Sequence, residues 1–137
     1  MKIIVDAMGG DNAPLEIVKG ALQGRARWGV DIVLTGDAAQ ILRALEECGE
    51  KTVPQGVEIA NATQTVEMCD DPATVFRRKK DTSMGVGLTL LKNGGGDAMV
   101  SAGSTGALLT GATLITKRIH GIRRAAMAPV IPTTTGS

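Results

Sequence analysis

Hydrophobic and polar positions form two kinds of pattern along the chain. Short apolar runs predict β-strands, and they lie at residues 2–6, 31–35, 57–60, 98–101 and 126–131. Between them, apolar residues recur at helical spacing, over Leu15–Leu22, Ile41–Cys48, Pro72–Lys80, Met84–Leu91 and Ala107–Arg118. Strands that alternate with helices predict an α/β fold, with a parallel sheet covered on both faces.

Local signals mark several helix ends. Pro14 suits the first turn of a helix, where its missing N–H costs nothing, and Gly29 closes that helix. Asp37 with Gln40 three residues later resembles a capping box and predicts the start of the next helix. Three glycines at residues 94–96 stop the helix that contains Leu88.

Composition narrows the class of protein. A chain of 137 residues with 43% hydrophobic and 21% charged residues is typical of one folded domain and excludes wholesale disorder. The only aromatic residues are Trp28 and Phe76, so the core is expected to be aliphatic and stacking of single-stranded nucleic acid is disfavoured. Two cysteines and one histidine, His120, predict neither a disulfide framework nor a zinc cluster.

Two apolar stretches bear on where the protein works. The run after Met1 stops at Asp6 and lacks the features of a secretory signal, so a cytoplasmic setting is expected. Ala98–Thr116 carries no charge and is long enough to span a bilayer. Its serines, threonines and glycines instead favour a buried strand, loop and helix, which leaves at most a peripheral association with membranes.

The formal net charge of +1 conceals an asymmetry. Residues 1–75 hold six Lys and Arg against twelve Asp and Glu, whereas residues 76–137 hold nine against two. The second part is therefore suited to attract an anion locally. Its densest basic run is Arg77–Lys80, with Arg78 and Lys79 in the middle. This run either docks an acidic partner or phosphate, or it is simply a solvated helix face.

Two glycine-rich loops follow predicted strands, at the sheet edge where parallel α/β proteins bind ligands. Ser101–Gly106 combines hydroxyl groups, glycines and the start of a helix, which favours binding of an anion such as phosphate. The candidate phosphate-binding residues are Ser101, Gly103, Ser104, Thr105 and Gly106. The alternative is a tight turn whose hydroxyls only cap the helix. The spacing matches neither a Walker loop nor the dinucleotide-binding pattern.

The first loop carries the candidate catalytic residues. Asp6 ends the first predicted strand, and Asp11 and Asn12 lie in the loop that follows. In one interpretation these side chains orient substrate or handle a proton. In the other, Asp11 and Asn12 satisfy backbone donors at the start of the helix.

Four segments in collinear order resemble the PlsX family, the phosphate acyltransferases of bacterial phospholipid synthesis. Ile4–Pro14 is similar to the family's N-terminal signature, and Asp71–Met84 is similar to its middle segment. Ser101–Ala107 resembles its SAGNTGA loop, with Ser104 where the family usually has asparagine. Gly121–Thr133 resembles the strand that follows, with Ala125 in place of a usual proline.

The resemblance implies a doubly wound, mostly parallel sheet with helices on both faces, a three-layer sandwich related to phosphotransacetylases. It also implies a homodimer that moves a fatty acyl group from acyl carrier protein to inorganic phosphate. Phosphate is then the nucleophile, so neither a metal nor a cofactor is expected, and Arg77–Lys80 is suited to meet the acidic carrier protein. Chains of the family are much longer, so residues 1–137 are expected to be the N-terminal part of a single α/β acyltransferase domain.

Two rival hypotheses need no catalysis by this chain. The second hypothesis is a non-enzymatic module that binds phosphate or a nucleotide, and the third is an inert fragment that folds only through self-association. A truncated parallel sheet has an unpaired edge and uncovered apolar surface, which favours self-association.

Overall fold

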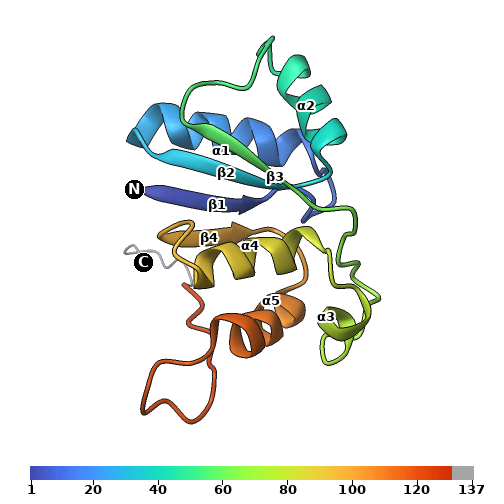
Figure 1. The fold of residues 1–137 in the computed structure, drawn as a ribbon, viewed down its shortest axis with the longest axis vertical. Coiled ribbons are helices and arrows are strands. Elements are labelled where there is room, and N and C mark those ends of the chain that lie inside the picture. The colour runs from blue at the N-terminus through green and yellow to red at the C-terminus, as the bar shows by residue number, and fades with distance from the viewer. Residues whose placement is uncertain (131–137) are drawn as a thin grey trace, which may run out of the picture.

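The sheet at the centre of the molecule is parallel throughout. The computed structural model describes residues 1–130, and its four strands run in the order β3-β2-β1-β4 (Figure 1). The strands are β1 (Lys2–Asp6), β2 (Asp31–Gly36), β3 (Val57–Asn61) and β4 (Ala98–Ser101). Asp6 lies in register with Thr35 on one side and Ser101 on the other. The predicted α/β class, with a doubly wound parallel sheet, is therefore confirmed.

Helices cover both faces of this sheet (Figure 1). One face carries α1 (Leu15–Trp28) and α2 (Ala38–Glu47), and the other carries α4 (Ser83–Lys92). The short helix α3 (Val75–Arg78) and α5 (Thr105–Gly111) accompany α4 on its side, and α5 continues as the π-helical turn η1 (Ala112–Thr116). Side chains alternate accordingly, with Val5 facing α1 and Ile4 facing α4.

The predicted helix ends are largely confirmed. Gly29 ends α1 in the left-handed region, with φ of 62°, and its N–H donates to the carbonyl of Arg25. The Asp37 carboxylate accepts from the N–H of Gln40 at 3.0 Å and so caps α2. Helix α3 is shorter than the predicted span of residues 72–80, because Asp71 and Thr74 form turns ahead of it.

The fifth predicted strand is wrong. Residues 126–130 have no regular secondary structure and are exposed, and Ile131 lies outside the described residues. Pro129 has no N–H for a ladder hydrogen bond, and the run has no buried face to hold it in place.

Two apolar clusters form the core. The larger one lies between the sheet and helices α1 and α2, and includes Leu34, Ile41 and Leu45. The smaller one joins α4 to α5 and α3 through Met84 and Leu88. The uncharged stretch of residues 98–116 is β4, α5 and η1 in sequence, as predicted. Within residues 1–130, no helix has the length and apolar character that a membrane span requires.

Candidate functional site

The two glycine-rich loops meet at one edge of the sheet. Strands β1 and β4 are direct neighbours, and Asp6 and Ser101 are register partners at their carboxyl ends. The loops at residues 7–14 and 102–104 therefore leave the sheet side by side; the sequence predicted their common edge but not the pairing of β1 with β4.

Asp6 lies beneath these loops and does not face solvent. It is 1% exposed, and its Oδ2 accepts a hydrogen bond of 2.7 Å from the Ser101 hydroxyl. Its Oδ1 accepts a longer bond, 3.4 Å, from the N–H of Met8. The Ser101 hydroxyl oxygen in turn accepts from the N–H of Gly103 at 3.1 Å. One chain of hydrogen bonds thus runs from the end of β1 through β4 into the second loop.

Gly9 allows the two loops to touch. A Cβ atom at this position would lie 2.9 Å from Oδ2 of Asp6 and 2.9 Å from the backbone nitrogen of Gly103. Both distances are shorter than real Cβ contacts, so only glycine fits without displacing the neighbouring loop. In the sequence Gly9 and Gly103 lie in separate loops, and nothing there predicts their direct contact.

The residues at the start of α5 divide into two roles. Ser104 is 8% exposed, and its hydroxyl oxygen accepts from the N–H of Ala107 at 3.4 Å. Ser104 is therefore the N-cap of α5, as the capping alternative proposed. Thr105 and Gly106 are exposed, and N–H groups in the first turn of a helix have no acceptor inside it. These two residues retain donors for a ligand.

Asp11 and Asn12 are exposed in the first loop. Helix α1 is preceded by Pro14 and has no hydrogen bond from a side-chain cap, so neither residue caps it. The backbone carbonyl of Asn12, not its side chain, accepts from the N–H of Glu16 at 3.2 Å. The two side chains therefore stand on the surface of the loop that touches Gly103.

The basic run is only partly available to a partner. Lys79 donates to Oδ2 of Asp70 at 2.6 Å and to the carbonyl of Thr65 at 3.2 Å. The hydrogen bond from Lys79 lowers the pKa of the Asp70 carboxyl, and the same bond raises the pKa of the Lys79 ammonium. Arg77, Arg78 and Lys80 are exposed. Lys79 thus anchors the segment, and the other three positive charges face solvent.

The segment that carries this run packs against α5. The Phe76 ring fills the space beside Gly111, where a Cβ would lie 2.7 Å from the ring. Pro72 lies against Gly106, where a Cβ would lie 3.3 Å from Cγ of the proline. The run and the second loop are therefore neighbours in space (Figure 1), although nothing in the periodicity of the sequence signalled this.

The described residues contain no cluster of three or more His, Cys, Asp or Glu side chains that could hold a metal. Cys48 and Cys69 are free thiols, and His120 is exposed beyond η1.

Fold and site together define a parallel α/β protein in which two touching glycine-rich loops, rich in hydroxyl and N–H donors, build the carboxyl edge of the sheet. A family model described as fatty acid synthesis protein matches residues 1–137. The chain belongs to this family, which confirms the resemblance to PlsX.

Relatives named phosphate acyltransferase are similar over the whole chain. The protein of Desulfitobacterium hafniense is 48% identical over 136 residues, covering 99% of this chain and 40% of the relative. That of Thermoanaerobacterium thermosaccharolyticum is 43% identical over 137 residues, covering 100% of this chain and 39% of the relative. That of Herpetosiphon aurantiacus is 40% identical over 136 residues, covering 99% of this chain and 36% of the relative. The chain thus spans about two fifths of the length of these relatives.

Proposed function

We propose that this chain forms the N-terminal part of a phosphate acyltransferase, which moves a fatty acyl group from acyl carrier protein to inorganic phosphate. The observation that carries the proposal is the similarity along all 137 residues to relatives with that printed name, at 43% identity in one and over 136 residues at 48% in another. Both loops of the candidate site lie within this matched region.

In the proposed reaction a phosphate oxygen attacks the carbonyl carbon of the acyl thioester. A C–O bond forms, the C–S bond breaks, and the carrier's thiol leaves with a proton. Phosphate supplies the nucleophile, so the protein has to position it and to stabilise the negative charge on the carbonyl oxygen. The exposed N–H groups and hydroxyl at Thr105 and Gly106 suit the first task, beside the N-cap Ser104.

The chain's carboxylates take different parts in this proposal. Buried Asp6 is a positioning residue, because it acts on the site only through the Ser101 hydroxyl and the loop beyond it. Exposed Asp11 and the neighbouring Asn12 are free to contact substrate, to orient phosphate or to take up a proton.

The basic surface is the proposed docking site for the carrier protein. Arg77, Arg78 and Lys80 project three positive charges from a segment that packs beside the second loop. Complementary charge speeds encounter with an acidic partner. We further propose that the full-length protein is a homodimer that works in the cytoplasm without a cofactor.

The test uses a full-length chain that contains these residues, with acyl carrier protein released by phosphate as the readout. A Ser104→Ala/Thr105→Ala double variant is expected to raise the KM for phosphate about tenfold or more, because the Thr105 hydroxyl donor is lost and the N-cap that positions the first turn of α5 is removed. Unchanged phosphate dependence would contradict the assignment of this loop. Phosphate binding without turnover of any acyl donor would instead support the non-enzymatic module.

Docking is tested separately. Reversing the charges of Arg77 and Arg78 to Glu is expected to raise the KM for the acylated carrier and to leave the KM for phosphate unchanged. The control is Lys92→Glu at the end of α4, which is also an exposed basic residue and lies outside the run. If the Lys92 variant raises the KM for the acylated carrier as much as the variant of the run, binding depends on net charge and not on the position of Arg77 and Arg78.

A further inference from the structure

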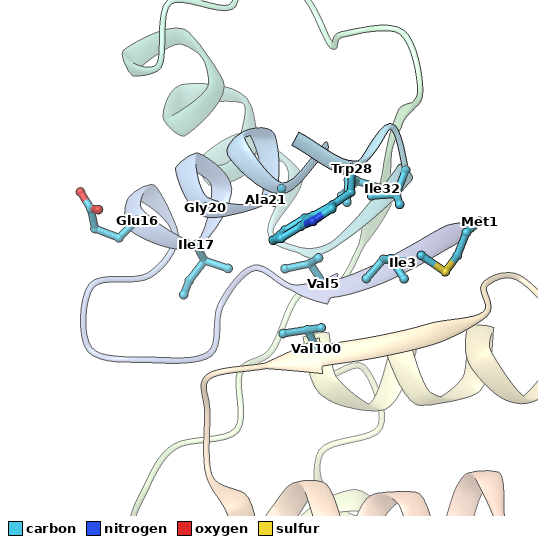
Figure 2. Close-up of a pocket in the computed structure, with 12 residues that line it drawn as sticks. Met1, Ile3, Val5, Glu16, Ile17, Gly20, Ala21, Trp28, Ile32 and Val100 are labelled. Atoms are coloured by element: carbon cyan, nitrogen blue, oxygen red, sulfur yellow. The ribbon is translucent and has the colours of Figure 1, made fainter. Parts of the chain in front are cut away.

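A large apolar cavity lies between α1 and the strands β1 and β4. It has a volume of about 550 Å³, and Figure 2 shows the apolar side chains around it. We call it the α1 groove. Ile3, Val5 and Val100 form its strand side, and Ile17, Gly20, Ala21, Gly24 and Trp28 form its helix side. Glu16 is the only charged residue among those that line it.

This face of the sheet is incompletely covered. Trp28 is 67% exposed, Val100 is 56% exposed and Met1 is 74% exposed, although all three border the same apolar space. On the opposite face of β1 and β4, α4 packs directly onto the strands. Strands of a parallel sheet are normally buried on both faces, so the exposed side chain of Val100 in β4 lacks a covering element in the described residues.

The helix side of the groove is shaped for close approach. A Cβ atom at Gly20 would meet nothing within 4 Å, and one at Gly24 would meet only the Trp28 ring, at 3.3 Å. Glycine weakens a helix relative to alanine, yet no contact within residues 1–130 requires it at Gly20. A glycine-lined helix face allows another backbone to come close.

The length of the relatives indicates what fills this space. The matched region is 40% of the Desulfitobacterium hafniense protein and 39% of the Thermoanaerobacterium thermosaccharolyticum protein, so most of each relative lies outside it. A second copy with its two-fold axis at the groove is a poorer fit, because it would set one concave groove against another and leave both empty. A convex apolar element from the same polypeptide fits the shape.

We propose that the α1 groove is the docking site for an apolar helix from the part of the full-length protein that lies beyond the matched region. The helix packs against Gly20 and Gly24, covers Val100 and Trp28, and completes the second face of the sheet. The proposal rests on family membership and on the geometry of the groove, and it holds whatever reaction the protein catalyses.

Trp28 is the chain's single tryptophan and reports occupancy directly. Residues 1–137 are compared with a full-length chain made by joining them to the remaining part of the Desulfitobacterium hafniense relative. Hydroxyl-radical oxidation is measured on each peptide by mass spectrometry. Oxidation of Trp28 is expected to fall several-fold in the full-length chain, whereas Met68, which is 79% exposed and distant in sequence, keeps its rate.

A substitution in the groove gives a second measurement. Gly20→Leu is expected to raise the melting temperature of the 137-residue chain, because the space is open and leucine favours a helix. In the full-length chain it is expected to lower the melting temperature, because the leucine occupies the helix's place. The control is Gln23→Leu, on an exposed part of α1 outside the groove. It is expected to shift the melting temperature of both chains by the same amount.

Two outcomes would overturn the proposal. One is equal Trp28 oxidation in the short and full-length chains. The other is protection of Trp28 in the short chain that grows with its concentration, which would assign the groove to a second copy. If the joined chain does not fold, the same footprint on the unaltered relative decides, at the positions aligned with Ile17 and Val100. Protection there supports the helix, and exposure there overturns it.

Discussion

Over β1 and β4, one face of the sheet is closely packed and the other is partly open, and the glycines in the covering helices differ accordingly. On one face, a Cβ atom at Gly87 of α4 would lie 2.7 Å from Cε of Met99 and 3.3 Å from Cγ2 of Ile4. On the other, a Cβ atom at Gly20 of α1 would meet nothing within 4 Å. The glycine in α4 is explained by contacts within the described residues. The glycine in α1 has no such contact within them, and the helix that we propose for the α1 groove would supply one.

The largest effect is expected from filling the tight face. Gly87→Leu forces four extra carbons between α4 and the strands, where Met99 and Ile4 leave no room. Overpacking of this kind should lower the free energy of unfolding by about 3 kcal/mol, as measured by urea denaturation. The matched variant Gly20→Leu should not destabilise the 137-residue chain. An equal loss in both variants would mean that the two faces do not differ.

Neighbouring residues of β4 give the next largest contrast. Met99 faces α4 and packs against the smaller apolar cluster, whereas Val100 faces the α1 groove and is 56% exposed. Met99→Ala should cost about 2 kcal/mol of unfolding free energy, because it leaves a cavity. Val100→Ala should cost no more than about 0.5 kcal/mol in the same chain.

The cost of Val100→Ala is expected to differ in the full-length protein. There, a helix in the groove should raise the cost of Val100→Ala toward that of Met99→Ala, since both side chains would be buried. A large cost already in the 137-residue chain would show that the groove is closed without further sequence.

Helix capping also differs between α4 and α1. The Thr82 hydroxyl is fully buried and accepts from the N–H of Gly85 at 3.0 Å at the start of α4. Thr82→Ala should therefore lower the free energy of unfolding by about 1 kcal/mol. Helix α1 has no side-chain cap, so Asn12→Ala should leave thermal stability unchanged. A comparable loss from Asn12→Ala would restore the capping role that the sequence left open for it.

Much of the fold could be predicted because its signals are local. Asp37 caps α2 through Gln40 and Gly29 ends α1, since both depend on residues close in sequence. The position of both loops at the same edge of the sheet also followed from the sequence, because parallel strands end at one edge. The predicted strand at residues 126–131 failed for the opposite reason, since a strand needs a partner and a buried face that its own residues do not specify.

The rest depends on contacts between residues far apart in sequence. The sequence marked Asp6 as a candidate substrate group, but its burial and its bond to Ser101 follow from the pairing of β1 with β4. The approach of Gly9 to Gly103 requires the same pairing. In the sequence, Lys79 belongs to a basic run that either docks a partner or faces solvent, and only the folded turn at residues 65–79 shows that it is bound to Asp70.

Ion pairs on the two sides of the sheet make the smallest contrast. Lys79 and Asp70 are 2.6 Å apart with side chains 28% and 22% exposed, beside the α4 layer. Lys19 and Glu16 on α1 are 3.7 Å apart and 54% and 55% exposed. A surface pair of the second kind contributes little. Lys79→Met should therefore destabilise the chain measurably at neutral pH, and Lys19→Met should not.

The pH dependence of this difference follows from the sign of the pKa shift. The hydrogen bond from Lys79 lowers the pKa of Asp70 in the folded state, so its contribution is present above the pKa of the unfolded carboxyl. The contribution is lost as the pH falls through the lowered folded-state pKa, where Asp70 takes up a proton. The pKa of Lys79 is raised, so the upper limit lies in the alkaline range. The gap in unfolding free energy between the parent chain and Lys79→Met should therefore be widest at neutral pH and should close in acid. A gap that stays constant down to full protonation of the carboxylates would show that Lys79 acts through packing of its methylene chain, not through its charge.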